Sequence, residues 1–142
     1  MAPLPRGTLQ NLALAKIADA RLLLQNSRYS NAYYLYGYGV ELGLKACIAR
    51  QILPETIPDK ALVSGSRSLF THRLMDLVVL AGLATDLRKR RDDPEFDSRW
   101  LVVVEWSEES RYELIDVAVA TAMGDAVEHE VDGVITWLKQ HW

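Results

Sequence analysis

The stretch "YSNAYYLYGYGVELGLKACIAR", residues 29–50, contains five of the six tyrosines and decides how the chain folds. Its apolar side chains recur every three or four residues, which is the spacing of one face of an α-helix. Gly37 and Gly39 each cost a helix about 1 kcal/mol relative to alanine. A helix tolerates that cost where another backbone must come close. We therefore expect a central helix over about 30–53 that is crossed tightly at its glycines.

The flanking segments are also helical in pattern. Apolar residues at spacings of three and four predict a helix over about 8–26. The segment 54–70 contains two prolines and predicts a loop, after which Thr71 is expected to cap a third helix. The next helical pattern contains Pro94, and because a proline inside a helix costs about 3 kcal/mol, we expect a kink or a break near Asp93.

The last third of the chain completes an all-helical pattern. A polar connection at 107–112 precedes a final helix, which we expect over about 113–140. The strand-like run "WLVVVEW", residues 100–106, is short and has no evident partner strand. The sequence therefore predicts an all-α fold, a single domain over 1–142 built as an up-and-down antiparallel bundle of four to five main helices.

The composition is that of an ordinary globular protein. The chain has 142 residues, of which 49% are hydrophobic and 25% charged. A formal net charge of -3 argues against capture of nucleic acid by the whole surface, although it leaves room for a local basic patch. The single cysteine, Cys47, falls in an apolar helical pattern and should be a small buried side chain. No signal peptide or membrane-length apolar run occurs, so we expect a cytoplasmic protein.

Cofactor motifs are missing from the sequence. There is no glycine-rich phosphate loop and no Cys/His zinc spacing, so we predict no cofactor and no metal. Asp125, His129 and Asp132 have the spacing of three ligands along one side of a helix. Without a ligand from a second helix they do not make a site, and an exposed acidic face is the preferred interpretation.

Four motifs in order carry a family resemblance. They are "AYYLYGYGVELGLKA" at 32–46, "THRLMDL" at 71–77, "FDSRW" at 96–100 and "WSEESRY" at 106–112. Their order along residues 8–140 resembles the HEPN family of small helical domains. The resemblance implies an antiparallel helical bundle that usually dimerises. Many members are metal-independent endoribonucleases, often toxins beside a nucleotidyltransferase antitoxin, and others are non-catalytic partners of nucleotide-handling enzymes.

The ribonuclease members typically carry an arginine followed, after four to six residues, by a histidine. Here "RSLFTH" supplies Arg67 and His72, although Ser68 stands where those members often have Asn or Asp. His72 would act as general acid or base on RNA, and Arg67 would hold the scissile phosphate. The motif lies earlier in the chain than is usual in those members. The alternative is a loop arginine and a histidine in the first turn of a helix.

A second stripe of the central helix offers a candidate ligand site. Tyr34 and Tyr38 could stack on a nucleotide base, with Glu41 and Lys45 on the same face. Because Glu41 and Lys45 are four residues apart, an ion pair between them is the structural alternative. Arg111, just before the last helix, is the expected further partner of Glu41.

A basic cluster is the best candidate for contact with phosphates. It comprises Arg88, Lys89, Arg90 and Arg91. The alternative is a solvated helix end whose charges complement the helix dipole. At the chain end, Trp137 and Trp142 suggest burial against a partner subunit, so we expect a homodimer.

These observations predict a role in nucleic-acid or nucleotide metabolism. The leading hypothesis is a HEPN-like dimeric accessory or toxin-type component paired with a nucleotidyltransferase-like partner. One alternative is a metal-independent RNA endonuclease that uses Arg67 and His72. A further alternative is a non-catalytic bundle that binds a protein or a small ligand between its helices.

Overall fold

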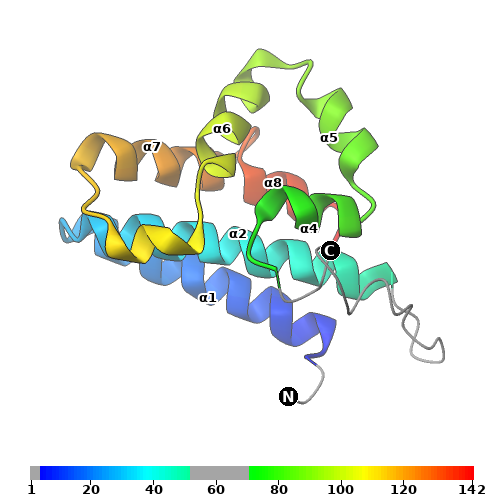
Figure 1. The fold of residues 1–142 in the computed structure, drawn as a ribbon, viewed down its shortest axis with the longest axis horizontal. Helices are drawn as coiled ribbons and strands as arrows, with labels where there is room; N and C mark the ends of the chain where they lie inside the picture. The colour runs from blue at the N-terminus through cyan, green and yellow to red at the C-terminus, as the bar shows by residue number, and fades with distance from the viewer. Residues whose placement is uncertain (1–3, 52–70) are drawn as a thin grey trace.

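The computed structural model describes residues 4–51 and 71–142, and within them it is entirely helical (Figure 1). These residues form seven α-helices and one 3₁₀ helix, and no strand occurs among them, which confirms the all-α prediction. In chain order the elements are α1 (Arg6–Gln25), α2 (Tyr29–Gln51), α4 (Leu74–Leu80), α5 (Ala84–Arg90), α6 (Pro94–Val104), η1 (Glu108–Tyr112), α7 (Val117–Glu128) and α8 (Val134–Lys139).

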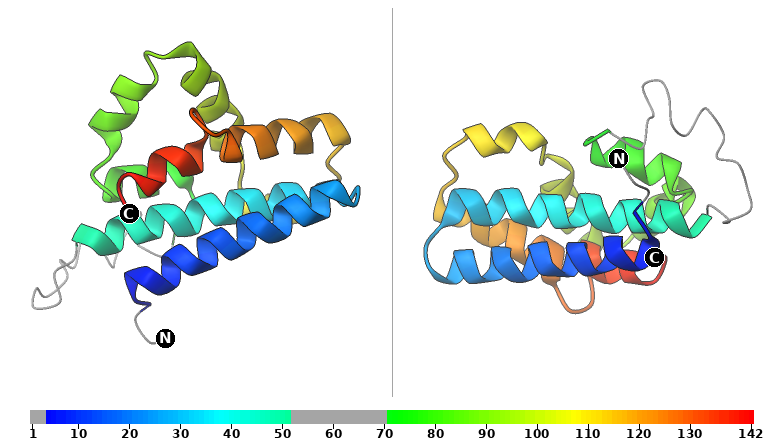
Figure 2. Two further views of the ribbon diagram at one scale, coloured as in Figure 1. Left: turned by 180° about the vertical axis from the view of Figure 1, so that it is seen from behind. Right: turned by 90° about the horizontal axis from the view of Figure 1, so that it is seen from below.

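The helix α2 is the centre of the molecule, as the tyrosine-rich stretch predicted. It runs antiparallel to α1, while α7 and α8 lie against its other side (Figures 1 and 2). The helix α4 and the 3₁₀ helix η1 also contact it. As a result, 13 of its 23 residues are buried, including Tyr36, Val40 and Leu44. Each surrounding element covers part of its circumference, so α2 has no continuous polar face.

Gly37 and Gly39, two of the three glycines of α2, both lie at close contacts, but only Gly39 faces another backbone as predicted. A Cβ atom at Gly39 would lie 2.6 Å from Cγ1 of Ile17 and 3.2 Å from the backbone oxygen of Ala13, so here the backbone of α1 crosses closely. At Gly37 the neighbour is not a backbone. The indole ring of Trp106 occupies the space that a Cβ atom would need.

The predicted break near Asp93 is present and has the form of a helix start. Pro94 is the first residue of α6, where the missing N–H of proline is not required. The carboxylate of Asp93 accepts a hydrogen bond from the backbone N–H of Glu95 at 3.0 Å and caps the helix. Residues 100–104 of the strand-like run form the second half of α6, which buries Trp100 and Val103.

The single final helix predicted over 113–140 is wrong, because two helices separated by a turn occupy this region. The helix α7 ends at Glu128, and Nδ1 of His129 then accepts a hydrogen bond from the backbone N–H of Asp132 at 2.9 Å. This local bond replaces helical hydrogen bonds and ends the helix. Val119 and Val131, whose spacing would place them on the apolar stripe of a single helix, are 44% and 66% exposed.

The start of α4 also differs from expectation. The helix begins at Leu74, with Arg73 at the capping position and no side-chain cap. The hydroxyl of Thr71, the predicted cap, instead accepts a hydrogen bond from the backbone N–H of Arg73 at 3.2 Å. His72 therefore lies in an extended segment ahead of the helix and is not in its first turn.

In the part of the chain that is described, none of the helices has the length and apolarity to cross a membrane.

Candidate functional site

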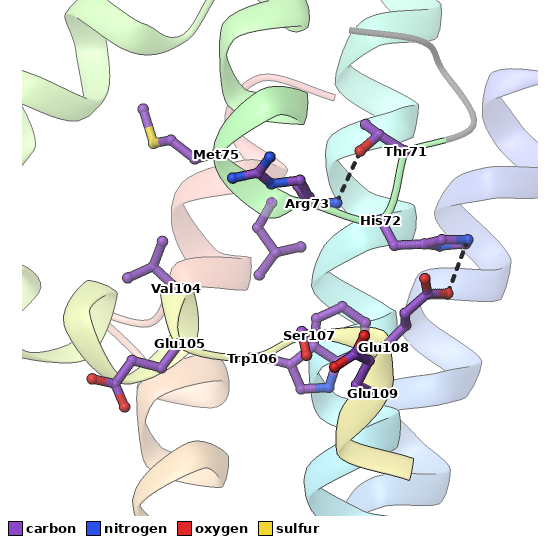
Figure 3. A pocket seen from close by; sticks show the side chains of 11 residues that line it. Thr71, His72, Arg73, Met75, Val104, Glu105, Trp106, Ser107, Glu108 and Glu109 are labelled. Carbon is purple, nitrogen blue, oxygen red and sulfur yellow. Dashed lines mark hydrogen bonds and ion pairs between the residues drawn. The ribbon is translucent and has the colours of Figure 1, made fainter. Parts of the chain in front are cut away.

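An open pocket of about 660 Å³ lies between the start of α4 and the end of α6. One wall is the segment 71–75, and the other is the segment 104–109, which runs from α6 into η1 (Figure 3). Met75 and Val104 give the pocket apolar surface, and Trp106 closes its lower end. Its position follows from Trp106, whose ring packs against Gly37 and so holds the second wall on α2.

The polar centre of this region is His72, whose two ring nitrogens each face a carboxylate. Nδ1 lies 2.8 Å from Oε1 of Glu41, which is 0% exposed on α2. Nε2 lies 3.2 Å from Oε2 of Glu108, which reaches across from η1 (Figure 3). The other oxygen of Glu41 accepts a hydrogen bond from Lys45 at 3.2 Å. A buried carboxylate requires such partners, because an unpaired buried charge is strongly destabilising.

These contacts set the chemistry of the imidazole. An ionised carboxylate only accepts hydrogen bonds, so the Nδ1 atom of His72 must carry a proton to bond Glu41. The contact between Nε2 and Glu108 becomes a hydrogen bond only when the ring carries a second proton. In this arrangement the outer nitrogen faces the carboxylate of Glu108.

The structure describes only one of the two residues of the predicted nuclease pair. Arg67 lies outside the described residues. His72 lies at the pocket and is half-buried, with a fixed orientation toward Glu41. The cation that the pocket does contain is Arg73, whose side chain is almost fully exposed and lies 3.8 Å from a carboxylate oxygen of Asp76.

The predicted ligand-binding stripe is present on α2, but its tyrosines pack against other aromatic rings. The rings of Tyr34 and Tyr38 are 6.0 Å apart, and Tyr34 lies 6.1 Å from Trp106. The ammonium of Lys16 lies 5.7 Å from the centre of the Tyr38 ring. Burial, and then the charge of Glu41, raise the pKa of Tyr38. Neither tyrosine lines the pocket.

The prediction that Arg111 is the further partner of Glu41 is wrong. Arg111 is exposed, and its guanidinium lies 4.9 Å from the centre of the Tyr112 ring. The nearby hydroxyls of Tyr112 and then Tyr34 raise the pKa of Arg111. His72 takes the predicted place beside Glu41. The sequence indicated that a buried carboxylate at Glu41 would need a hydrogen-bond donor. It did not indicate His72 as that donor, because the two residues are 31 positions apart.

The basic cluster is partly structural. The guanidinium of Arg90 lies 4.7 Å from the centre of the Phe96 ring and 3.8 Å from Asp132. Arg91 pairs with Asp97 at 2.6 Å. The other two residues, Arg88 and Lys89, form no ion pair with any residue that the structure describes. Half of the cluster therefore holds α5 against its neighbours, and half faces solvent.

The three candidate ligands near the C-terminus do not share a helix face. Asp125 pairs with Arg99 at 3.1 Å, and His129 ends α7, so Asp132 lies beyond the break. Across residues 4–51 and 71–142 no group of three His, Cys, Asp or Glu side chains could hold a metal ion.

Cys47 is buried, as expected. Its Sγ atom lies 3.7 Å from the backbone oxygen of Leu138. Burial raises the pKa of the thiol to about 12, so the reactive thiolate is scarce.

No protein-family model, curated protein or solved structure matches the chain.

Proposed function

We propose that this chain is a HEPN-like accessory or toxin-type protein of nucleic-acid or nucleotide metabolism. It acts as a homodimer with a nucleotidyltransferase-like partner, and its pocket docks a basic segment of that partner. The HEPN-like order of motifs supports the biological setting. The observation that carries the docking role is the charge of the pocket wall, where Glu105, Glu108 and Glu109 stand within five residues.

The charges of the pocket favour a cationic partner over RNA. Glu105 and Glu109 form no ion pair with any part of the chain that is described, and Glu108 faces His72. Arg73 is the single permanent cation along the two walls. Three carboxylates against one guanidinium repel a phosphate backbone, whose binding requires neutralisation by Lys and Arg. The same wall attracts lysine and arginine side chains and aligns them by charge complementarity.

The apolar surface of the pocket adds a second requirement. Met75 is 42% exposed at the pocket, and Val104 is partly exposed on the opposite wall. Because exposed apolar surface is stabilised when it is removed from water, the matching ligand places an apolar side chain between Met75 and Val104. The partner segment is therefore basic and amphipathic, with an apolar anchor beside lysine or arginine.

A model peptide tests this docking role. We expect a short Lys/Leu amphipathic peptide to shift the amide NMR resonances of residues 71–75 and 104–109, and its Glu/Leu counterpart not to do so. Replacing Glu105→Gln and Glu109→Gln together should weaken binding about tenfold or less, as rim charges do. The matched control is Asp92→Asn with Glu130→Gln, which changes the net charge equally outside the pocket. Equal weakening in both double variants, or shifts elsewhere on the surface, would contradict the proposal.

A second candidate function is metal-independent RNA cleavage by Arg67 and His72. The observation that favours it is the bond from Nδ1 of His72 to the buried Glu41, because a carboxylate that fixes one ring nitrogen orients the other for general acid–base work. In the same preparation, RNA cleavage in excess chelator is compared between wild type and His72→Ala. Equal cleavage, or none in either protein, removes this candidate. Cleavage by wild type that is lost in the variant replaces the docking role by catalysis.

A further inference from the structure

Three elements of the fold meet at the side chain of His72. It lies in the segment before α4, bonds Glu41 of α2 through Nδ1 at 2.8 Å, and faces Glu108 of η1 through Nε2 at 3.2 Å. The inner contact is buried, because Glu41 is shielded from solvent. The outer contact is open to water, since the side chain of Glu108 is 41% exposed. The two halves of the contact therefore differ in how firmly they are held.

The 3₁₀ helix η1 has few other polar attachments. It has only five residues, and no side chain caps its first turn. Short 3₁₀ helices have poor hydrogen-bond geometry and depend on tertiary contacts. The hydroxyl of Ser110, although buried, has no hydrogen-bond partner among the described residues. Glu108 to His72 is the ion pair that joins η1 to another element within the described structure, so the state of His72 bears directly on η1.

We propose that His72 is a proton-controlled latch that fastens η1 to α2. A ring with one proton keeps it on Nδ1, where the buried carboxylate of Glu41 requires a donor. The lone pair on Nε2 then faces the carboxylate of Glu108, and the two repel each other. When the ring takes a second proton from solvent, Nε2 donates to Glu108 as well, and both carboxylates are bridged. Acid closes the latch, and base releases it.

The charges around the ring are compatible with this direction. On α2, Lys45 bonds the second oxygen of Glu41 and offsets its charge. Burial, and then the charge of Glu41, raise the pKa of Tyr38 on the same helix. Arg73, the next residue along the chain, directs its guanidinium toward Asp76. On the α6–η1 side, Glu105, Glu108 and Glu109 are all acidic. Because Glu41 is already paired with Nδ1 and with Lys45, the second ring proton, on Nε2, is donated to Glu108.

Hydrogen exchange in the intact protein measures the latch. The backbone amides of Ser110 and Glu113 donate to Ser107 and Ser110 at 3.0 Å each, so they report on η1. We expect their protection factors to fall about two- to fivefold from about pH 5 to about pH 8, the range in which histidine changes charge, as befits a half-exposed ion pair. Protection of the Val40 and Leu44 amides should stay constant over the same interval. Constant protection of the η1 amides over this interval overturns the latch.

A pair of glutamine variants separates this latch from a general effect of charge. In Glu108→Gln the amide can accept from a protonated ring and donate to a neutral one, so the pH dependence of η1 protection should disappear. Glu109→Gln removes the same charge one residue further on, from a side chain without an ion pair in the described structure, and should keep the wild-type pH profile. Identical profiles in the two variants would overturn the latch. Neither result depends on whether the pocket docks a partner.

Discussion

At the scale of the residue, the buried carboxylate of Glu41 organises the site. Burying a charge in the middle of a helix is costly unless hydrogen-bond donors surround it. Lys45, four residues later, supplies one donor and was visible in the sequence as an i,i+4 pair. His72 supplies the other from a distant segment. The same residue that resembles a nuclease histidine is therefore also a structural partner of α2.

The contact between Gly37 and Trp106 leads to a residue-scale prediction. Gly37→Ala would place a methyl group inside the indole ring of Trp106. Trp106 is only 3% exposed, so its ring must shift against buried neighbours to make room. Overpacking of this kind costs about 1–3 kcal/mol, whereas the gain in helix propensity is about 1 kcal/mol. We expect a net loss of up to about 2 kcal/mol in the free energy of unfolding, measured by urea denaturation.

Gly7 is the matched control for this substitution, because a Cβ atom there would meet nothing within 4 Å. Gly7→Ala should cause no loss and a gain of up to about 1 kcal/mol. If Gly37→Ala is as stable as Gly7→Ala, Trp106 does not occupy the space beside Gly37, which we call the notch in α2. The wall of the pocket would then lack its anchor.

At the scale of the element, local chemistry sets where the helices begin and end. Asp93 and Pro94 start α6, and Asp116 starts α7 by accepting a hydrogen bond from the backbone N–H of Val119 at 2.9 Å. His129 ends α7 through its own ring nitrogen. The proline was a strong enough signal to predict the first of these boundaries. The histidine was not, since the valines on either side kept the apolar period of a helix and concealed the turn.

The cap of α6 gives the element-scale prediction. Asp93→Ala removes the carboxylate that accepts the N–H of Glu95, and loss of such a cap typically costs about 1 kcal/mol. We expect the midpoint of thermal unfolding to fall accordingly. Asp92→Ala is the control, because Asp92 is exposed and caps no helix. An equal shift in both variants would mean that the effect comes from charge near the basic end of α5.

At the scale of the whole molecule, the tryptophans do not point to a partner subunit as the sequence suggested. Trp137 is buried inside its own chain, where its ring packs at 5.7 Å from Phe96 and its Nε1–H donates to Asp86 at 2.6 Å. Trp142 is partly buried, with a ring atom 3.6 Å from the position of a Cβ at Gly43. Both side chains therefore pack within their own chain, and the prediction of a dimer rests on the HEPN resemblance alone.

A homodimer stays a prediction on that ground, and mass in solution tests it. We expect sedimentation equilibrium to give twice the chain mass of 16.0 kDa at protein concentrations where association is favoured. Trp142→Ala serves as a control, since a side chain that packs on its own α2 should not change the dimer constant. A single-chain mass at every concentration would contradict the dimer, and a dimer lost in Trp142→Ala would place the interface at the chain end.

The sequence by itself determined that this protein is all-α, that the tyrosine-rich segment is the central helix, and that a break falls at Asp93. These properties follow from apolar period, glycine cost and proline geometry, which act within a few residues along the chain. Tertiary structure alone decided that His72 meets Glu41 and Glu108, that Arg111 does not, and that Trp106 fills the notch at Gly37. Such contacts depend on how helices pack around a shared core, and no local pattern encodes which distant side chain arrives beside a buried charge.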